Sequence, residues 1–355
     1  MVVKTDFDPA VLQAFLCARL SGPPGLTGPM TLQRIGGGQS NPTWFVSFDN
    51  RRLVLRMQPA GNLLPGAHAV DREARVMQAL TGSALPVPQV LLFHAGREVV
   101  GTPFYVMERV EGRVFADCAL PGMTPAERRA IYLAMADTMA TLHRVDWAAC
   151  GLADYGRQGG YFSRQIARWS RQSELSQQSA TKPNADIEAL RAWLPAHLPD
   201  EAETTVCHGD FRLGNLMFHP TEPRVVAVLD WELSTLGHPL ADVAFNAMAW
   251  RTLPSEYGGL RGLDLAALGI PTEAEYLAHY LHQAGRRDGI TAFHFAFALF
   301  RMAVIFEGIA ARAAAGNAVA DNAGEVGGLA AAFAHRAMEF VRGDAVPTLP
   351  AAVPA

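Results

Sequence analysis

The sequence predicts an α+β fold in which a small, β-rich N-terminal lobe precedes a larger, mainly helical C-terminal lobe. Three observations lead to this prediction. Residues 31–57, 87–93 and 103–110 have the composition and apolar alternation of strands. One segment of helical period, residues 67–81, interrupts them. Beyond Gly112 the apolar pattern is mostly helical.

These patterns divide the chain into an N-terminal lobe of residues 1–110, a C-terminal lobe of residues 111–346 and a Pro/Ala-rich tail of residues 347–355. We expect the tail to be disordered. Half of the 355 residues are apolar and 18% are charged, which is typical of a globular protein. In a two-lobed protein we expect a ligand to bind in the cleft between the lobes.

The elements of the N-terminal lobe have local signals. Asp8 and Pro9 are typical of the start of a helix. The Gly- and Pro-rich residues 21–28 indicate a linker. The pair Asp49-Asn50 lies between two strand-like runs and indicates a hairpin turn.

The C-terminal lobe begins with a strong helix signal. Thr124 and Glu127 form a capping-box pattern, and the helix that follows extends to about His143. Short strands are predicted within residues 206–218 and 225–229. The apolar pattern predicts further helices in residues 160–197, in residues 239–250, and in the stretches after Thr272 and Thr291.

The composition argues against several classes of partner. A net charge of −4 does not fit a nucleic-acid-binding surface. The apolar stretch of residues 290–315 contains Arg301 and Glu307, so it predicts a buried helix and no membrane span. The four cysteines are scattered and the N-terminus lacks a signal-peptide pattern, which favours the cytoplasm. The oligomeric state is left open.

The strongest chemical signal is the segment of residues 208–215, HGDFRLGN, with Asp230 after the next apolar run. Phosphoryl transfer needs a carboxylate to receive a hydroxyl proton and ligands for Mg²⁺. Asp210 and Asn215 have the spacing of the base and the metal-binding asparagine in kinase catalytic loops. Asp210 is therefore our candidate base, and Asn215 and Asp230 are candidate Mg²⁺ ligands. Each short motif also occurs in ordinary polar turns.

Together these residues are similar to the aminoglycoside phosphotransferase (choline kinase-like) superfamily, and most closely to the kinase domain associated with acyl-CoA dehydrogenases. The resemblance spans about residues 31–342. It rests on the segments 38–43 (GQSNPT), 54–56 (VLR), 64–73 (LPGAHAVDRE), 101–108 (GTPFYVME), 208–215 (HGDFRLGN), 230–232 (DWE) and 300–301 (FR). It implies a protein-kinase-like fold with an ATP cleft between the lobes.

The resemblance assigns further residues to ATP. The glycine-rich turn would cover the phosphates, with Gly38, Gln39, Ser40 and Asn41 as its contacts.

Arg56 would contact the phosphates from the third strand, paired with the helix residue Glu73. Arginine suits this role because it is permanently charged, and the chain has only two lysines, Lys4 and Lys182. The alternative role for Arg56 is that of a surface residue at the end of a strand.

The resemblance also assigns the adenine contact and the support of the catalytic loop. Met107, Glu108 and Val110 would form the hinge that pairs with adenine. The resemblance implies that Asp242 supports the loop, although Asp242 also suits an ordinary helix start. His208 is expected from its place in the motif to brace the loop by hydrogen bonds and not to act in catalysis.

The acceptor is implied by the resemblance alone, which points to a hydroxyacyl-CoA or a related hydroxy acid. Arg301, on an apolar helix, is a candidate substrate contact, and a buried structural ion pair is the alternative role. The rival acceptor is an aminoglycoside or amino alcohol. Residues 255–340 contain no dense acidic cluster of the kind that a cationic acceptor requires.

Two other classes of protein make different demands on these residues. A pseudokinase, which binds nucleotide without turnover, would lack a catalytic group, but Asp210, Asn215 and Asp230 are all present. A metal-dependent hydrolase could use His208 with Asp210 and Asp230, but the other histidines are dispersed.

Overall fold

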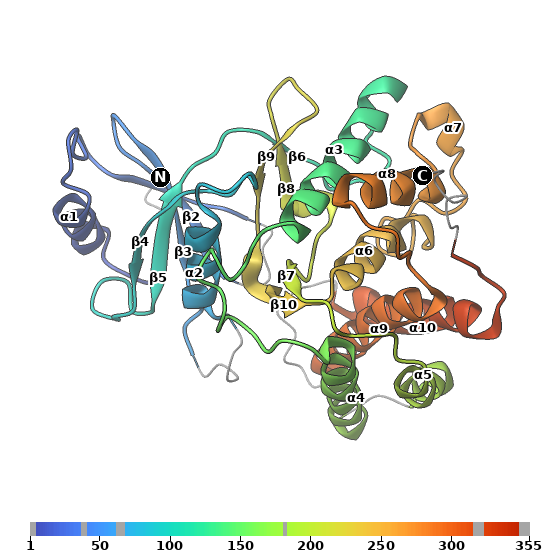
Figure 1. Cartoon of the computed structure of the whole chain (residues 1–355). Coiled ribbons are helices and arrows are strands. Elements are labelled where there is room, and N and C mark those ends of the chain that lie inside the picture. Colours follow the sequence, from blue (N-terminus) through green and yellow to red (C-terminus); the bar gives the residue numbers. More distant parts are fainter. Residues whose placement is uncertain (1–4, 37–40, 62–67, 180–182, 315–322, 348–355) are drawn as a thin grey trace. The chain divides into compact units, whose positions relative to one another are not determined.

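The computed structural model of the chain is shown in Figure 1. It describes residues 5–36, 41–61, 68–179, 183–314 and 323–347.

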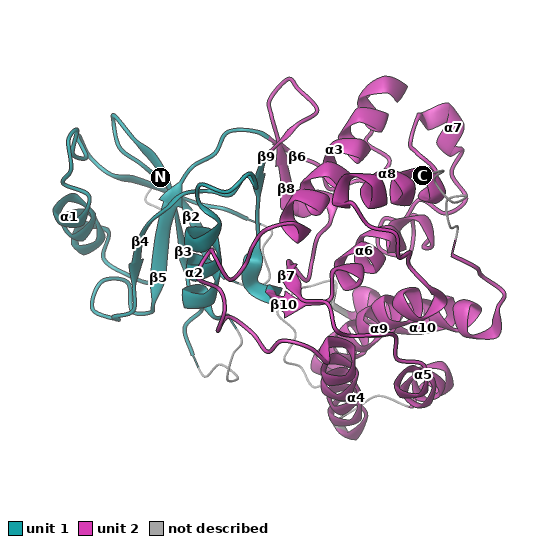
Figure 2. Cartoon of the chain, viewed as in Figure 1, with its two compact units in different colours: residues 1–112, 226–234 teal, residues 113–225, 235–355 magenta. Residues whose placement is uncertain are grey.

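Two compact units divide the chain (Figure 2). Unit 1 consists of Met1–Gly112 with Val226–Ser234, and unit 2 consists of Arg113–Val225 with Thr235–Ala355. This division differs from the predicted one because a short segment from the middle of the chain joins the N-terminal part. Most of the predicted tail lies outside the described residues.

Unit 1 is built on a five-stranded antiparallel sheet with the order β1-β2-β3-β5-β4. The strands are β1 (Thr31–Arg34), β2 (Thr43–Ser47), β3 (Arg52–Met57), β4 (Val90–His94) and β5 (Phe104–Glu108). Strands β2 and β3 form the predicted hairpin, with Ser47 opposite Arg52 and the turn residues Asp49 and Asn50 between them. Alternation along β2 buries Trp44 and Val46.

Two helices accompany the sheet. Helix α1 (Pro9–Arg19) is capped by Asp8, whose carboxylate accepts from the Ala10 amide, and its Leu12 and Leu16 join the core with Val46. Helix α2 (Val70–Leu80) packs against β4 and β5. Its buried face is apolar except for Glu73. A buried carboxylate is costly without partners, so Glu73 requires polar or charged neighbours.

The segment Val226–Ser234 contacts the rest of unit 1 at several points. The Val228 amide donates to the Pro86 carbonyl at 2.9 Å, and the short 3₁₀ helix η2 (Trp231–Leu233) packs against α2. The unit boundary falls within strand β9 (Val225–Val228). Asp230 is therefore brought to the N-terminal part of the chain, although it follows Asp210 by only twenty residues.

Unit 2 is mainly helical. Its helices are α3 (Pro125–His143), α4 (Tyr161–Ser179), α5 (Ala185–Ala196), α6 (Pro239–Ala247), α7 (Leu265–Leu268), α8 (Glu273–Ala284), α9 (Ala292–Ala314) and α10 (Ala323–Arg342), with the 3₁₀ turns η1 (Leu213–Asn215) and η3 (Met248–Trp250). Two antiparallel strand pairs complete it: β6 (Arg113–Val114) with β8 (Leu216–Phe218), and β7 (Thr205–Cys207) with β10 (Thr235–Gly237). The predicted capping box of Thr124 and Glu127 is confirmed.

Helix α9 forms the centre of unit 2. It packs against α4, α6 and α10, and most of its residues from Phe293 to Gly308 are buried. Within the described ranges it is the one helix long and apolar enough to cross a membrane, and 83% of its apolar window is buried inside the protein. It packs as a core helix, which agrees with the prediction from Arg301 and Glu307.

Candidate active site

The predicted catalytic loop follows β7 and is anchored by the first turn of α6. Asp242 of α6 accepts hydrogen bonds from the backbone amides of His208, at 2.6 Å, and Gly209, at 2.9 Å. Its carboxylate also lies 3.5 Å from His143 Nε2. Burial by itself raises the pKa of Asp242, but His143 and the other donors outweigh it and hold that pKa below its usual value. The carboxylate thus supports the loop in its charged form.

The loop brings Asp210 and Asn215 into direct contact. Asn215 Nδ2 donates to the Asp210 carbonyl at 2.8 Å and to Asp210 Oδ2 at 2.7 Å. Arg212 Nε lies 3.3 Å from the same carboxylate oxygen. The Asp210 side chain is 23% exposed, so a reactant can approach it. Because the amide nitrogen of Asn215 faces Asp210, its carbonyl oxygen is the group that could ligate a cation.

Four other residues fix the loop. Arg301 of α9 is buried and donates through NH2 to the Gly209 carbonyl at 2.6 Å. Gly209 has a φ of 83°, a conformation that glycine adopts without strain. Asn246 donates to the Phe211 carbonyl at 3.0 Å, and His208 Nδ1 accepts from the Asp210 amide at 3.2 Å.

These contacts bear on two predicted roles. His208 is fully buried within the loop, where its place in the motif predicts a brace. Arg301 was a candidate substrate contact, and its observed hydrogen-bond partner is the loop backbone. His143 and Asn246 were missed, because nothing in their local sequence distinguishes them from ordinary helix residues.

A second charged cluster lies in unit 1 around Arg56 of β3. Arg56 Nε is 2.8 Å from Glu73 Oε2, and its NH2 group is 2.5 Å from Asp230 Oδ1. Burial opposes the charge on Arg56, but Glu73 and Asp230 outweigh it and raise the pKa of the guanidinium further. The arginine thus stays charged and links helix α2 to the segment that carries Asp230.

The partners of Glu73 go beyond the predicted ion pair. Tyr105 Oη donates to Glu73 Oε2 at 3.1 Å, and Asn41 Nδ2 donates to Glu73 Oε1 at 2.5 Å. Asn41 Oδ1 lies 3.1 Å from His68 Nδ1. Asn41, predicted as a phosphate contact, is buried against Glu73 in this structure. Gly38, Gln39 and Ser40, predicted for the same turn, lie outside the described residues.

Asp230 has an unusual backbone. Its φ of 63° and ψ of 66° are left-handed, a region that aspartate visits more readily than most residues other than glycine. Such conformations are costly and gather at functional sites. The conformation turns the chain sharply between β9 and η2, with one carboxylate oxygen on Arg56. The other oxygen is a candidate cation ligand.

The predicted hinge lies at the end of β5. Met107 is paired with Val54 of β3 and Val90 of β4. The Glu108 amide already donates to the Gln89 carbonyl at 2.9 Å. The Glu108 carbonyl and the Val110 amide are therefore the groups of this segment to consider for an adenine.

The donor set suits Mg²⁺, which prefers oxygen ligands and usually keeps several waters or phosphate oxygens. Asp230 offers a carboxylate oxygen and Asn215 an amide oxygen. In the part of the chain that the structure describes, no group of three or more His, Cys, Asp or Glu side chains gathers as a ready-made metal site. The oxygen donors that these two residues offer are of the kind that Mg²⁺ prefers.

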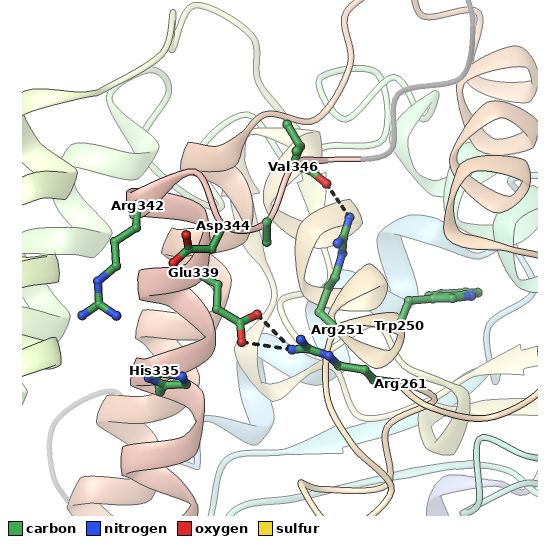
Figure 3. A pocket seen from close by; sticks show the side chains of 9 residues that line it. Trp250, Arg251, Arg261, His335, Glu339, Arg342, Asp344 and Val346 are labelled. Atoms are coloured by element: carbon green, nitrogen blue, oxygen red, sulfur yellow. Dashed lines mark hydrogen bonds and ion pairs between the residues drawn. The ribbon is translucent and has the colours of Figure 1, made fainter.

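Two cavities of unit 2 differ in their relation to the catalytic loop. The larger, about 530 Å³, is lined by Arg251, Arg261 and Arg342 and contains no loop residue (Figure 3). Its arginines are ion-paired, Arg251 with Glu273, Arg261 with Glu339 and Arg342 with Asp186. A smaller cavity of about 80 Å³ adjoins the loop at Arg212, Leu213 and Gly214.

The chain resembles known proteins over most of its length. Residues 31–292 match the phosphotransferase enzyme family, APH. Mouse acyl-CoA dehydrogenase family member 10 is 44% identical over 318 residues, which are 88% of this chain and 29% of the mouse protein. The chain thus spans less than a third of that relative.

Two solved structures share the fold. A Ralstonia eutropha protein, provisionally assigned as an aminoglycoside phosphotransferase, is 43% identical with a TM-score of 0.85, covering 95% of this chain and 99% of that one. A thermostable mutant of the aminoglycoside phosphotransferase APH(4)-Ia, in complex with AMP-PNP and hygromycin B, is 18% identical with a TM-score of 0.59. The match covers 87% of this chain and 95% of the mutant's chain. At this level of identity it shows the fold alone.

Proposed function

The chain belongs to the phosphotransferase enzyme family, and from that premise we propose that it transfers the γ-phosphate of ATP to a hydroxyl group of a small molecule. It has the kinase-like fold of the aminoglycoside phosphotransferases, with a β-sheet N-terminal region and a helical remainder. One observation carries the proposal. The carboxylate of Asp210 is partly exposed and oriented by Asn215 and Arg212 on a loop anchored by Asp242.

Asp210 acts as the base in this proposal. Its carboxylate receives the proton of the acceptor hydroxyl as the phosphorus–oxygen bond forms. The hydrogen bonds from Asn215 and Arg212 fix the direction of the carboxylate before the acceptor arrives. Preorganisation of this kind is the main contribution that a protein can make to phosphoryl transfer, where positioning and charge dominate.

Arg56 and the hinge serve the nucleotide. Arg56 is charged and held in place by Glu73 and Asp230, so its guanidinium can contact phosphate oxygens without first being ordered. The Glu108 carbonyl and the Val110 amide would pair with adenine. Mg²⁺, held by Asn215 and Asp230, would neutralise charge on the phosphates when bound. ATP use is supported by the AMP-PNP complex of the fold relative.

For the acceptor, we propose a hydroxyacyl-CoA or a related hydroxy acid. The mouse relative is named for acyl-CoA dehydrogenases, and this chain matches 29% of its length. The small cavity beside the catalytic loop also supports an acceptor with an aliphatic chain. Among its described lining residues are Phe245, Met302 and Phe333, and no Asp or Glu. An aminoglycoside is polycationic and would favour a site lined by carboxylates. It stays the alternative acceptor because the Ralstonia eutropha relative is named as an aminoglycoside phosphotransferase.

The test is ATP consumption with Mg²⁺ against a panel of 3- and 4-hydroxyacyl-CoAs, the free hydroxy acids, choline and kanamycin. We expect turnover with a hydroxyacyl-CoA and none with kanamycin. Turnover with kanamycin or choline alone would retain the kinase mechanism and refute the acyl-CoA acceptor. ATP binding without turnover on any member would favour the pseudokinase interpretation.

A further inference from the structure

We propose that the small cavity beside the catalytic loop binds the aliphatic chain of the acceptor beyond its hydroxyl-bearing carbon, and that Ala249 and Tyr257 limit the length of that chain. We call it the loop-side cavity. It is lined by Arg212, Phe245, Ala249, Tyr257, Met302 and Phe333, among others. The inference rests on the proposed function and adds to it the part of the site that selects the acceptor.

The first argument is position. Arg212 lines the loop-side cavity and also lies 3.3 Å from the Asp210 carboxylate. The cavity therefore begins one side chain away from the proposed base. All of its lining residues belong to unit 2 (Figure 2). A hydroxyl held at Asp210 would leave the rest of a carbon chain within reach of it.

The second argument is size and chemistry. One water molecule needs about 10–15 Å³ of volume open to its centre. The loop-side cavity offers about 80 Å³, which is room for several methylene groups. Its walls are largely apolar. Arg212 supplies the one charge among the described lining residues, and it is positive. The unpaired buried acceptor Asn246 Oδ1 is neutral. These walls favour an uncharged chain over a polyamine.

The third argument is Tyr257, which lines the loop-side cavity from a strained loop. Its φ of 68° is left-handed, a genuine outlier for a bulky side chain. The loop is tight, since a Cβ on Gly259 would lie 1.9 Å from the Thr252 carbonyl oxygen. The Tyr257 ring is half-exposed, yet it packs edge-on against Phe306 at 5.3 Å. An exposed aromatic ring held at such cost suits a ligand contact.

The cavity wall behind Tyr257 is rigid. Phe306 packs edge-on against Phe333, with 4.9 Å between the ring centres, and Phe333 and Met302 are both buried. Helices α9 and α10, which carry these residues, pack closely against each other. The cavity is thus bounded by core side chains, and its size is set by packing. A chain that meets this wall can extend further only if core side chains move.

The kinetic test uses a series of hydroxy acids and hydroxyacyl-CoAs that differ only in the number of carbons beyond the hydroxyl. In the wild type, kcat/KM should rise about fourfold with each added methylene until the cavity is full. In Ala249→Phe, which narrows the cavity, the rise should stop at shorter chains, so the ratio of kcat/KM between the longest and the shortest acceptor should fall. Ala331→Phe places the same ring at an exposed position of α10 and should behave as the wild type. An equal loss for all chain lengths in Ala249→Phe would overturn the inference.

A binding test separates this inference from the proposed function. Linear primary alcohols of increasing length are titrated against the whole chain, with thermal stabilisation as the readout. They should stabilise the wild type and Ala331→Phe but not Ala249→Phe. This pattern without turnover on any acceptor would refute the kinase proposal and keep the cavity assignment. Turnover on hydroxyacyl-CoAs with neither chain-length dependence nor alcohol binding would refute the cavity assignment alone.

Tyr257 provides an independent check. Tyr257→Gly relieves the backbone strain and removes the ring, so it should raise the melting temperature and lower kcat/KM for long acceptors. A residue with only a structural role would lose stability when its ring is removed. Higher stability with unchanged acceptor preference would show that the ring does not contact the acceptor.

Discussion

At the scale of single residues, the described contacts of Asp210 converge on one carboxylate oxygen. Oδ2 receives Asn215 and Arg212, which leaves Oδ1 as the atom available to a hydroxyl proton. Arg56 in unit 1 is likewise shared between two carboxylates, those of Glu73 and Asp230. The first arrangement depends on the Asp210 carboxylate and the second on the planar guanidinium of Arg56. Substitutions that keep the size or the charge of each side chain should therefore test its role.

Replacing Asp210 with Asn removes the proton acceptor while keeping the size of the side chain. We expect kcat to fall by about 10²–10⁴-fold, the usual contribution of a general base. Nucleotide affinity, measured by calorimetry with AMP-PNP, should stay near that of the wild type. Asp71→Asn, at an exposed position on α2, is the control. Full activity in the Asp210 variant would show that the base lies elsewhere.

Replacing Arg56 with Lys keeps the charge but loses the planar fork that reaches two carboxylates. Loss of one charged hydrogen bond should lower the free energy of unfolding by about 1.5–3 kcal/mol. The KM for ATP should rise, and the KM for the acceptor should not. The matched control is Arg52→Lys, an exposed arginine on the same strand. Equal effects in both variants would argue against a specific role for Arg56.

At the scale of elements, the catalytic loop owes its shape to two helices. Helix α6 supplies Asp242, whose charge binds two loop amides, and α9 supplies Arg301, which binds the Gly209 carbonyl. Loop, α6 and α9 therefore act together, although they are far apart in the sequence. Helix α9 also carries His294 near its start, buried against Phe162 and Phe293.

Asp242→Asn leaves one of the two loop amides facing an amide group that cannot accept. We expect a loss of about 1–3 kcal/mol in the free energy of unfolding, the cost of a buried unsatisfied donor. The pKa of Asp242 is held below its usual value, so its stabilisation is present above about pH 3.9, the unfolded value, and is lost as the pH falls. Unfolding in urea at pH 7 and pH 3 should show the two proteins converging at the lower pH. A constant difference would contradict this account.

His294 should make the protein sensitive to mild acid. Burial lowers the pKa of His294 from 6.5 to about 3. The unfolded chain therefore binds a proton between these values that the folded chain does not, and stability must fall as the pH drops below 6.5. Between pH 7 and pH 5 the wild type should lose about 2 kcal/mol more than His294→Asn. The exposed His282→Asn should lose as much as the wild type. Identical pH profiles for all three proteins would contradict the prediction.

At the scale of the whole molecule, the predicted reactive groups come from both compact units. Arg56 and Asp230 belong to unit 1, and Asp210 and Asn215 belong to unit 2. Because unit 1 also includes Val226–Ser234, its fold is complete only when a segment from beyond residue 225 joins the sheet and α2. The positions of Arg56 and Asp230 therefore depend on the folding together of segments that are far apart in the sequence.

Binding of Mg²⁺ and ATP to the native chain should therefore be visible in its thermal unfolding. A ligand present at one hundred times its Kd stabilises by about 2.7 kcal/mol through mass action. We expect a higher melting temperature with Mg²⁺ and ATP, and a smaller increase when EDTA removes the metal. The variants Asn215→Ala and Asp230→Ala should lose the metal-dependent part of the shift. An increase that is indifferent to EDTA would argue against these two residues as metal ligands.

The sequence by itself determined the elements and the chemical types in the candidate site. Strand alternation and the capping box of Thr124 and Glu127 depend on neighbouring residues, so they can be read locally. The same holds for Asp210 and Asn215, whose contact follows from a five-residue spacing. Arg56 and Glu73 were predicted through the resemblance, and Asp230 through its place after an apolar run. The structure brings the side chains of all three together.

Only the tertiary structure decided which distant residues complete these groups. Asn246 and Arg301 reach the loop from two separate helices, and His143 reaches Asp242, the loop's anchor, from a third. Tyr105 of β5 reaches Glu73 of α2. Asn41 contacts a carboxylate where a phosphate was expected. Such contacts depend on how apolar faces pack, which fixes the side chains that meet across the core. No local period or motif encodes that choice, because the helices that meet are similar in sequence pattern to many that do not.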